Sequence, residues 1–512
     1  MDRRTFIKRS AAVSGLAFAG PFQGLTARAA TGSPLSRIPG YGPLVLKGDL
    51  WLPAEFNYQV ISRQGSRMSD GQLTPGIFDG MGAFRGFPGR TILIRNHENR
   101  ELDGETKVVT GKHEYDAETW GGNTKLEIKR TPEGRDPLTG QMLYTYKVVR
   151  DFAIVGGTTT NCAGGNVGRS WVTCEEAVKG PTATGTLYAP KRHGYIFEVP
   201  VDANVPIDPV PVKAAGRFVH EAVSWVDGML YMTEDRRRLK DTVGNLGEFG
   251  GCFYRYIPEN FRPDDGDGDE GGDSVPLTVP RLAQTRGKLQ ALKLRNEWHA
   301  NMEDGRPVGV AYPVEWVDIL DPDHNDDTDN RIDRKPGFIS TRLQAQDQGA
   351  AWFEKMEGMF AEWPNGNDDD GPRKVFFVCS GATLPNMGAV WMYDPVSQTL
   401  TKLYESPGEQ DLQNPDNVVV VPQTGNLLIC EDGPNDSAQF IRGLTQDGEI
   451  YDFCQTTEAN VTEFAGACFD PDGHTLYVSQ QGEREGLPQG LPQKSAVTYA
   501  IYGPFGKLLN RG

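Results

Sequence analysis

Residues 156–176 bring a cysteine and two carboxylates together in a pattern that suits metal binding. Cys162 lies in a glycine-rich turn, and Glu175 and Glu176 follow one short apolar strand later. A thiolate is a strong ligand for iron or zinc, whereas carboxylates bind hard cations such as calcium. The combination suggests a site for more than one kind of metal ion. The alternative is that Cys162 is buried and inert.

The sequence lacks the common signatures of other hydrolytic and nucleotide chemistry. It contains no Gly-x-Ser-x-Gly elbow with an ordered triad, no Walker phosphate loop and no Rossmann fingerprint. Clustered cations held by carboxylates can lower the pKa of a water molecule without a serine or histidine nucleophile. We therefore expect any hydrolytic chemistry to depend on metal ions.

Short strands joined by tight turns must position these residues. Glycine (61) and proline (35) are abundant among the 512 residues, which favours many strands and turns over helices. A turn next to a short apolar strand recurs along the chain, at residues 226–235, 374–380, 388–394, 399–404, 424–432 and 472–480. Such hairpins cannot bury both faces alone. We expect them to stack radially as an all-β propeller, with a β-sandwich as the main alternative.

The remaining segments contain few helical signals. Residues 344–363 are the best helical candidate, although Gly349 and Gly358 weaken it. The acidic stretches are expected to be long solvated loops rather than ordered calcium sites; they lie at residues 264–273, 321–333 and 365–371. The first of them lacks the spacing and the terminal glutamate of an EF-hand.

The charge balance limits the partners of the protein. With 69 acidic and 52 basic residues the net charge is −17, so nucleic acid is not expected as a specific partner. A phosphate ester would be repelled in the same way unless bound cations neutralised the carboxylates, which again favours metal. Most of the seven cysteines lie in apolar runs and are expected to act as small hydrophobes, namely Cys252, Cys379, Cys430, Cys454 and Cys468.

An ordered set of short segments resembles the PhoX-type alkaline phosphatases, an exported bacterial family. Asn-Cys-Ala-Gly-Gly at residues 161–165 and Thr-Cys-Glu-Glu at 173–176 are similar to the family signature, with residues 166–169 in place of its Thr-Pro-Trp-Gly. Further pieces agree in order, at residues 95–98, 217–222, 253–256, 352–358, 415–417, 430–433 and 463–466. The resemblance implies a six-bladed propeller with long loop insertions.

The resemblance also implies hydrolysis of phosphate monoesters on a cluster of iron (Fe3+) and calcium (Ca2+) ions. It makes Cys162 an iron ligand. Carboxylate ligands are implied at Glu175 or Glu176, Glu221, Glu357 and Asp416. Asn96 and Glu98 are implied nearby as candidates for the calcium shell. The alternatives are structural: a capping turn at Asn96, an exposed strand end at Glu221 and a common turn at Asp416.

Lys355 departs from the family at a position that binds phosphate. The family carries an arginine two places before its glutamate, whereas this chain has Lys355 before Glu357. Lysine is a point charge rather than a bidentate fork, so phosphate would be held less tightly. No second basic phosphate contact is evident. The alternatives to a phosphatase are a calcium-dependent propeller lactonase or phosphotriesterase, which needs no sulfur ligand, and a non-catalytic exported binding module.

The first 29 residues have the order of a twin-arginine (Tat) signal peptide. Arg3 and Arg4 precede an apolar run, and Ala27 and Ala29 frame a cleavage site. The run is too short to span a bilayer, and no later stretch is apolar enough to cross one. We expect residues 30–512 to form a single propeller domain, exported to the periplasm or beyond by the Tat machinery as a monomer.

Replacing Arg3 and Arg4 by lysine should strand the precursor in the cytoplasm, because the Tat pathway reads the adjacent arginines. Cell fractionation followed by immunoblotting measures the distribution. Normal periplasmic accumulation of the double variant would contradict Tat export.

Overall fold

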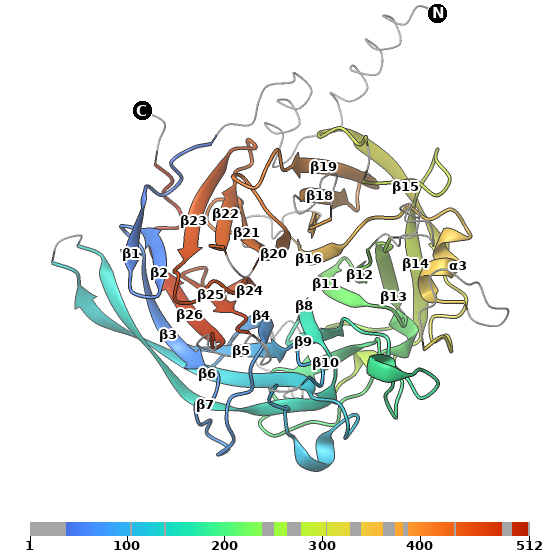
Figure 1. Ribbon diagram of the computed structural model, residues 1–512, viewed down its shortest axis with the longest axis horizontal. Coiled ribbons are helices and arrows are strands. Elements are labelled where there is room, and N and C mark those ends of the chain that lie inside the picture. Colours follow the sequence, from blue (N-terminus) through green and yellow to red (C-terminus); the bar gives the residue numbers. More distant parts are fainter. Residues whose placement is uncertain are drawn as a thin grey trace, which may run out of the picture.

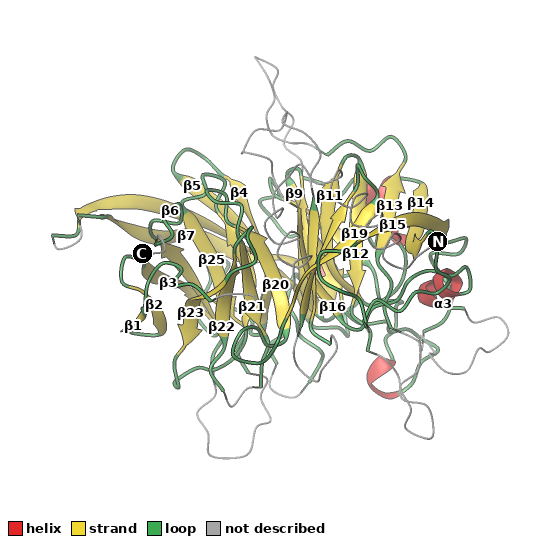
Figure 2. Cartoon of the chain, turned by 90° about the horizontal axis from the view of Figure 1, so that it is seen from above, coloured by secondary structure: helices red, strands yellow, loops and turns green. Residues whose placement is uncertain are grey.

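The computed structural model describes residues 37–102, 105–137, 140–237, 250–263, 278–303, 305–327, 339–361, 374–381, 388–434, 437–483 and 494–509. The predicted signal peptide and the acidic stretches 264–273 and 365–371 lie outside these ranges, as do residues 328–333 of the third stretch. Strands dominate the described chain, which confirms the prediction of an all-β protein (Figure 2).

Innermost strands surround the centre of the molecule and form a closed ring (Figure 1). In ring order the described ones are β4 (Phe78–Arg85), β8 (Asn161–Val167), β11 (His220–Val226), β16 (Met356–Ala361), β20 (Pro415–Val420) and β24 (Phe464–Phe469). Each strand contacts the next in this order, and β24 contacts β4. Sheets extend outward from the ring, so side chains at its centre come from segments far apart in the sequence.

Antiparallel neighbours extend each innermost strand outward. β4 is extended by β5 (Arg90–His97), β6 (Gly121–Arg135) and β7 (Met142–Thr158). β8 is extended by β9 (Ser170–Glu175) and β10 (Ile196–Pro200). β11 is extended by β12 (Met229–Glu234), β13 (Tyr254–Pro258) and β14 (Gly287–Leu294). β16 is extended by β17 (Val375–Cys379), β18 (Ala389–Asp394) and β19 (Thr399–Glu405). β15 (Ala311–Asp318) pairs with both β14 and β19, so the strands from β11 to β16 form one nine-stranded sheet.

The last two sheets join the beginning of the described chain to its end. β20 continues into β21 (Leu427–Glu431), β22 (Phe440–Leu444) and β23 (Ile450–Thr456), and then into β2 (Leu50–Pro53) and β1 (Leu44–Lys47). β24 continues into β25 (Thr475–Gln480), β26 (Val497–Tyr502) and the early strand β3 (Asn57–Arg63). This pairing of β3 with β26 ties the two ends of the ring together.

Alternating side chains of each inner sheet pack against the two neighbouring sheets. In β17, Phe377 belongs to a core cluster with Tyr231 of β12, whereas the adjacent Phe376 belongs to a cluster with Val418 of β20. A strand buried on both faces reads as a continuous apolar run, as Val-Phe-Phe-Val-Cys does here. All seven cysteines are buried free thiols, which confirms that Cys252, Cys379, Cys430, Cys454 and Cys468 pack as small hydrophobes.

A β-bulge interrupts every strand of the ring near its start. One extra residue stands on the inner strand at each of these places. A bulge bends the strand and re-aims the extra side chain. The bulges begin at Asp79, Cys162, Glu221, Glu357, Asp416 and Gly466. The same backbone irregularity thus recurs in each innermost strand, and every bulge residue except Gly466 carries a side chain that can ligate a metal.

The predicted helix at residues 344–363 is wrong in its extent. The helix present is α3 (Thr341–Gln346), capped by Ser340, whose Oγ accepts a hydrogen bond from the backbone of Leu343. Gly349 has a φ of +85° and lies against Trp298, which turns the chain away from a helical path. Residues 356–361 form β16 instead.

Elsewhere in the described ranges, the helical elements are single 3-10 turns at Gly111–His113, Gly185–Leu187, Lys213–Ala215 and Leu282–Gln284. Within the described chain, none of the helices has the length and apolar character needed to cross a membrane.

Gly358→Ala should destabilise the fold, because β16 and β20 approach closely at their bulges. A Cβ at residue 358 would lie 2.5 Å from the carbonyl oxygen of Asp416 and 2.8 Å from the Cα of Asn417. Such overpacking costs about 1–3 kcal/mol of unfolding free energy. Gly408→Ala, where a Cβ meets nothing within 4 Å, is the matched control and should be close to neutral. Denaturant unfolding measures both, and equal stability of the two variants would contradict the close approach.

Candidate metal centre

The bulges bring four of the predicted ligands together at the centre of the ring. Cys162 and Glu221 lie with Glu176 in one group, and Glu221 lies with Glu357 and Asp416 in another. In each group the candidate ligand atoms are within 4.8 Å of one another. Glu221 belongs to both groups, so the two potential sites share a bridging carboxylate.

Cys162 lies where its thiolate could bind a metal ion, rather than where it would only fill the apolar core. Its Sγ lies 2.9 Å from Oε2 of Glu221, to which the thiol donates a hydrogen bond. Burial raises the pKa of the Cys162 thiol well above its ordinary value, and the charges of Glu221 and Glu176 raise it further. A thiol in this setting ionises only if a cation replaces its proton.

The carboxylates of the centre are buried close to one another, which favours cation binding. Burial raises the pKa of Glu221 well above its ordinary value, and the neighbouring carboxylates of Glu357 and Glu176 add to that shift. Burial and then Glu357 do the same for the pKa of Asp416. Each ionised carboxylate therefore repels the others, and a divalent or trivalent cation would relieve that repulsion.

Lys355 is the residue immediately before β16, and its φ of +51° marks a strained turn. Its ammonium group pairs with Glu357 and lies 3.4 Å from Oδ2 of Asp235. Burial lowers the pKa of Lys355, but Glu357 and Asp235 raise it well above its ordinary value. The side chain is therefore a permanent cation among the carboxylates.

Glu357 lies near both a basic residue, Lys355, and an acidic residue, Asp235. Its Oε1 accepts hydrogen bonds from Lys355 and from Oγ of Ser380, the latter at 2.6 Å. Burial and the charge of Asp235 raise the pKa of Glu357 to about 7, although Lys355 and Ser380 oppose the shift. Ser380 and Lys355 thus orient the Glu357 carboxylate through the same oxygen.

Glu98 lies at the edge of the centre, beside a carboxylate that sequence analysis missed. It is buried, and Arg100 and Gln481 donate hydrogen bonds to it, Gln481 at 3.0 Å. The same Gln481 amide donates to Asp79, also at 3.0 Å. Burial and the charge of Glu98 raise the pKa of Asp79 well above its ordinary value.

Asn96 holds the bulge that carries Cys162. Its Nδ2 donates to the carbonyl oxygens of Cys162 and Ala163, at 2.6 and 2.8 Å. Its Oδ1 accepts from Nε1 of Trp171 at 2.8 Å and from Oγ1 of Thr173 at 3.1 Å. The amide therefore ties the backbone of Cys162 and Ala163 to side chains of β9.

Of the adjacent pair at the end of β9, Glu176 and not Glu175 joins the ligand groups. Glu175 points the other way, as alternate residues of a strand do. Its carboxylate accepts hydrogen bonds from Nδ1 of His193 at 2.7 Å and from the backbone of Gly194 at 2.8 Å. Burial lowers the pKa of His193, but Glu175 and Asp116 raise it, to about 9. Glu175 therefore anchors the strand end from which Glu176 projects.

Several residues near the centre were not predicted as site residues, namely Asp79, Arg100, Asp235, Ser380, Asp432 and Glu463. Asp79 occupies the same bulge position as Cys162 and Glu221, so the recurring order of an acid followed by a small residue could have indicated it. Burial raises the pKa of Glu463, and nearby Asp432 raises it further. No pattern in the sequence indicated Arg100, because only the fold brings it next to Glu176.

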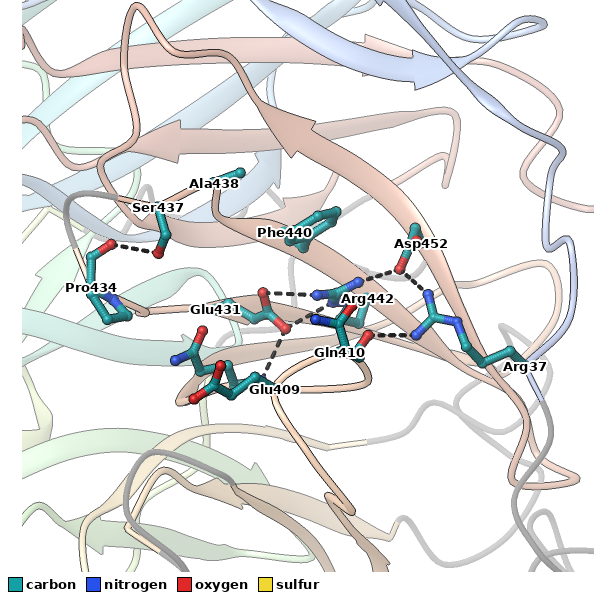
Figure 3. Close-up of a pocket in the computed structure, with 11 residues that line it drawn as sticks. Arg37, Glu409, Gln410, Glu431, Pro434, Ser437, Ala438, Phe440, Arg442 and Asp452 are labelled. Atoms are coloured by element: carbon teal, nitrogen blue, oxygen red, sulfur yellow. Dashed lines mark hydrogen bonds and ion pairs between the residues drawn. The ribbon is translucent and has the colours of Figure 1, made fainter.

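A separate cavity of about 720 Å³ lies beside β21 and β22 (Figure 3). Four of its charged groups pair with one another: Arg442 with Glu431 at 2.8 Å, and Arg37 with Asp452 at 2.6 Å. None of its residues belongs to the two groups of candidate ligands that distinguish the metal centre.

Comparisons with known proteins agree with this arrangement at the level of the family. The model of the family described as Alkaline phosphatase PhoX matches residues 40–482. None of the curated proteins compared with the chain matches it.

Solved structures resemble the chain only loosely. A luciferin-regenerating enzyme is 11% identical with a TM-score of 0.32, and the match covers 88% of this chain and 96% of that one. A protein of unknown function from Dyadobacter fermentans DSM 18053 is 10% identical with a TM-score of 0.36, covering 88% of this chain and 100% of that one. Superpositions this loose transfer no property to this chain.

The metal-free protein should lose stability as pH rises from 5 to 8. Glu357 has a pKa of about 7 in the folded chain and an ordinary value of 4.5, so the native state binds more protons than the unfolded state in this range. The slope of unfolding free energy with pH is then negative, and Glu357 alone accounts for roughly 3 kcal/mol. Urea unfolding after chelation measures the slope.

Glu357→Gln should flatten that slope, because glutamine does not titrate. Glu55→Gln, at an exposed carboxylate, should leave it unchanged. Stability of the chelated wild type that is constant or rises over the same pH range would contradict the raised pKa of Glu357.

Proposed function

The chain belongs to the alkaline phosphatase PhoX family and is a phosphoric monoester hydrolase, and from that premise we propose that it works with iron and calcium ions held at the centre of the ring. The single observation that carries the proposal is the pair of ligand groups joined by Glu221. One group contains a thiol and the other only carboxylates. That division suits Fe3+ at the Cys162 side and Ca2+ at the oxygen-only side.

The donor set fits these ions on chemical grounds. Buried carboxylates whose pKa values are raised by one another lack compensating charge, and multivalent cations supply it. We assign Cys162, Glu176, Glu221, Glu357 and Asp416 as ligands, with Glu98 in the calcium shell. Asn96 and Glu175 belong to the support of the site, because their hydrogen bonds position Cys162 and Glu176.

Phosphomonoester hydrolysis requires positive charge near the phosphoryl group, and cations bound at this centre would supply it. Negative charge spreads over the phosphoryl oxygens as the bond to the leaving group breaks. When bound, the cations would offset that charge and activate the attacking water. Lys355 is the residue that we assign to the substrate, where its ammonium group would hold a phosphoryl oxygen and orient the ester. Ser380 would keep Glu357 aligned during this step.

The scaffold that we propose is a six-bladed propeller formed as one domain by residues 30–512. The ring of innermost strands supports it, because antiparallel neighbours extend each of these strands outward and the ring closes from β24 to β4. The pairing of β3 with β26 supports closure of the last blade by an early strand.

We further propose that the protein is a monomer exported by the Tat machinery to the periplasm or beyond. The adjacent arginines and the short apolar run of the first 29 residues support this route. A pathway that carries folded proteins would allow the metal cluster to be loaded before export.

Cys162→Ser should remove iron, visible colour and phosphatase activity together. A hydroxyl stays protonated near neutral pH and is a poor substitute for a thiolate on iron. Cys468→Ser, at a buried cysteine outside both ligand groups, is the control and should keep all three. Elemental analysis, the visible spectrum and hydrolysis of a chromogenic phosphate monoester are the measurements. Wild-type iron and activity in Cys162→Ser would refute the assignment of the cluster.

Lys355→Ala should raise KM about tenfold or more while iron and calcium persist, because it removes a charged contact to substrate and no ligand. Steady-state kinetics and elemental analysis of the same preparation separate the two effects. Loss of metal with unchanged KM would place Lys355 in the support of the cluster instead.

A further inference from the structure

Arg100 is a basic residue at the metal centre with no role in the function proposed so far. It follows β5 on the loop that begins with Glu98. Its Nε donates to Oε1 of Glu98 at 2.8 Å, and its Nη2 lies 3.3 Å from Oε2 of Glu176. Both partners are residues that we assign to the metals, so the guanidinium stands directly beside the cations.

The loop fixes the backbone of Arg100 independently of those partners. Its N–H donates to Oε2 of Glu105 at 2.5 Å. The next residue, Glu101, accepts from Oγ1 of Thr159 at 3.0 Å and pairs with Lys179. Because the backbone is already ordered, only the side chain must rearrange when the neighbours of the guanidinium change.

The guanidinium is open to a ligand, unlike the groups it contacts. The side chain of Arg100 is 39% exposed, whereas those of Glu98 and Glu176 are 3% and 18% exposed. Lys355 pairs with Glu357, which lies in the ligand group that shares Glu221 with the group of Glu176. Arg100 and Lys355 therefore each pair with a carboxylate of one of two groups joined by Glu221.

We propose that Arg100 is a second phosphate-binding residue, which donates to phosphoryl oxygens of the substrate when cations occupy Glu98 and Glu176. A carboxylate that coordinates a cation gives up much of its charge, which loosens its hold on the guanidinium. The freed N–H groups form a fork that matches two phosphoryl oxygens. Arg100 thus supplies the bidentate contact that Lys355, a point charge, cannot provide.

This inference rests on the proposed function, and direct phosphate binding tests it without turnover. Metal-loaded wild type, Arg100→Ala and Arg100→Lys are titrated calorimetrically with inorganic phosphate, and their iron and calcium contents are measured. Arg63→Ala is the control, because Arg63 is similarly exposed and also pairs with a carboxylate, Asp49 at 2.8 Å, but on the outer strand β3.

Arg100→Ala should weaken phosphate binding about 10- to 100-fold and raise KM in parallel, with the metal content of wild type. Arg100→Lys should recover part of the affinity, since it restores charge without the fork. Phosphate affinity equal to wild type in Arg100→Ala, or loss of metal from both Arg100 variants, would overturn the assignment. A wild-type protein that binds phosphate at Arg100 but does not hydrolyse esters would refute the proposed function and leave this binding role in place.

Discussion

Repulsion among buried carboxylates is the constraint around which the centre of this protein is organised. At 4.8 Å, the separation within which the ligand atoms of each group lie, two like charges repel by about 3 kcal/mol even at an effective dielectric constant of 20. A few such pairs rival the whole stability of a typical domain, which is about 5–15 kcal/mol. The fold therefore tolerates this cluster only when protons, basic side chains or metal ions balance it.

The β-bulge is the local structure that creates this concentration of charge. An ordinary strand alternates its side chains between the two neighbouring sheets, as Phe376 and Phe377 do. The extra residue at each bulge breaks the alternation and directs one side chain to the central axis. Small residues after the bulge let adjacent strands approach, and Gly80 packs against the backbone of Cys162 and Ala163 for this reason. Ligand geometry and ring packing are thus set by the same backbone irregularity.

The sequence was sufficient for the parts of the site that depend on residue type and local order. Cys162, Glu221, Glu357 and Asp416 were predicted, and the fold brings them together. The choice between Glu175 and Glu176 could not be made, because it depends on which face of β9 meets the centre. The helix expected at residues 344–363 was wrong because a turn at Gly349 and pairing with β17 outweigh local helical preference.

Residues whose role arises from the fold alone escaped prediction for a different reason. Asp79 stands in Phe-Asp-Gly, which reads as a turn until the matching bulges of the other strands are seen. Arg100 meets Glu176 only because β5 and β9 end at the same side of the centre. Ionic contacts of this kind have no local pattern, since they join segments distant in the sequence.

The substrate-binding roles that we propose for Arg100 and Lys355 would allow a protein with a net charge of −17 to bind an anionic substrate. Arg100 and Lys355 each pair with carboxylates that we assign to the metals or that lie beside them. In the metal-free chain these two basic side chains pair with carboxylates of the protein, so little positive charge remains for phosphate. Metal binding would take over that balance and leave both side chains free to bind phosphate. Substrate affinity would then depend on metal occupancy through charge alone, without any change in the position of the ring.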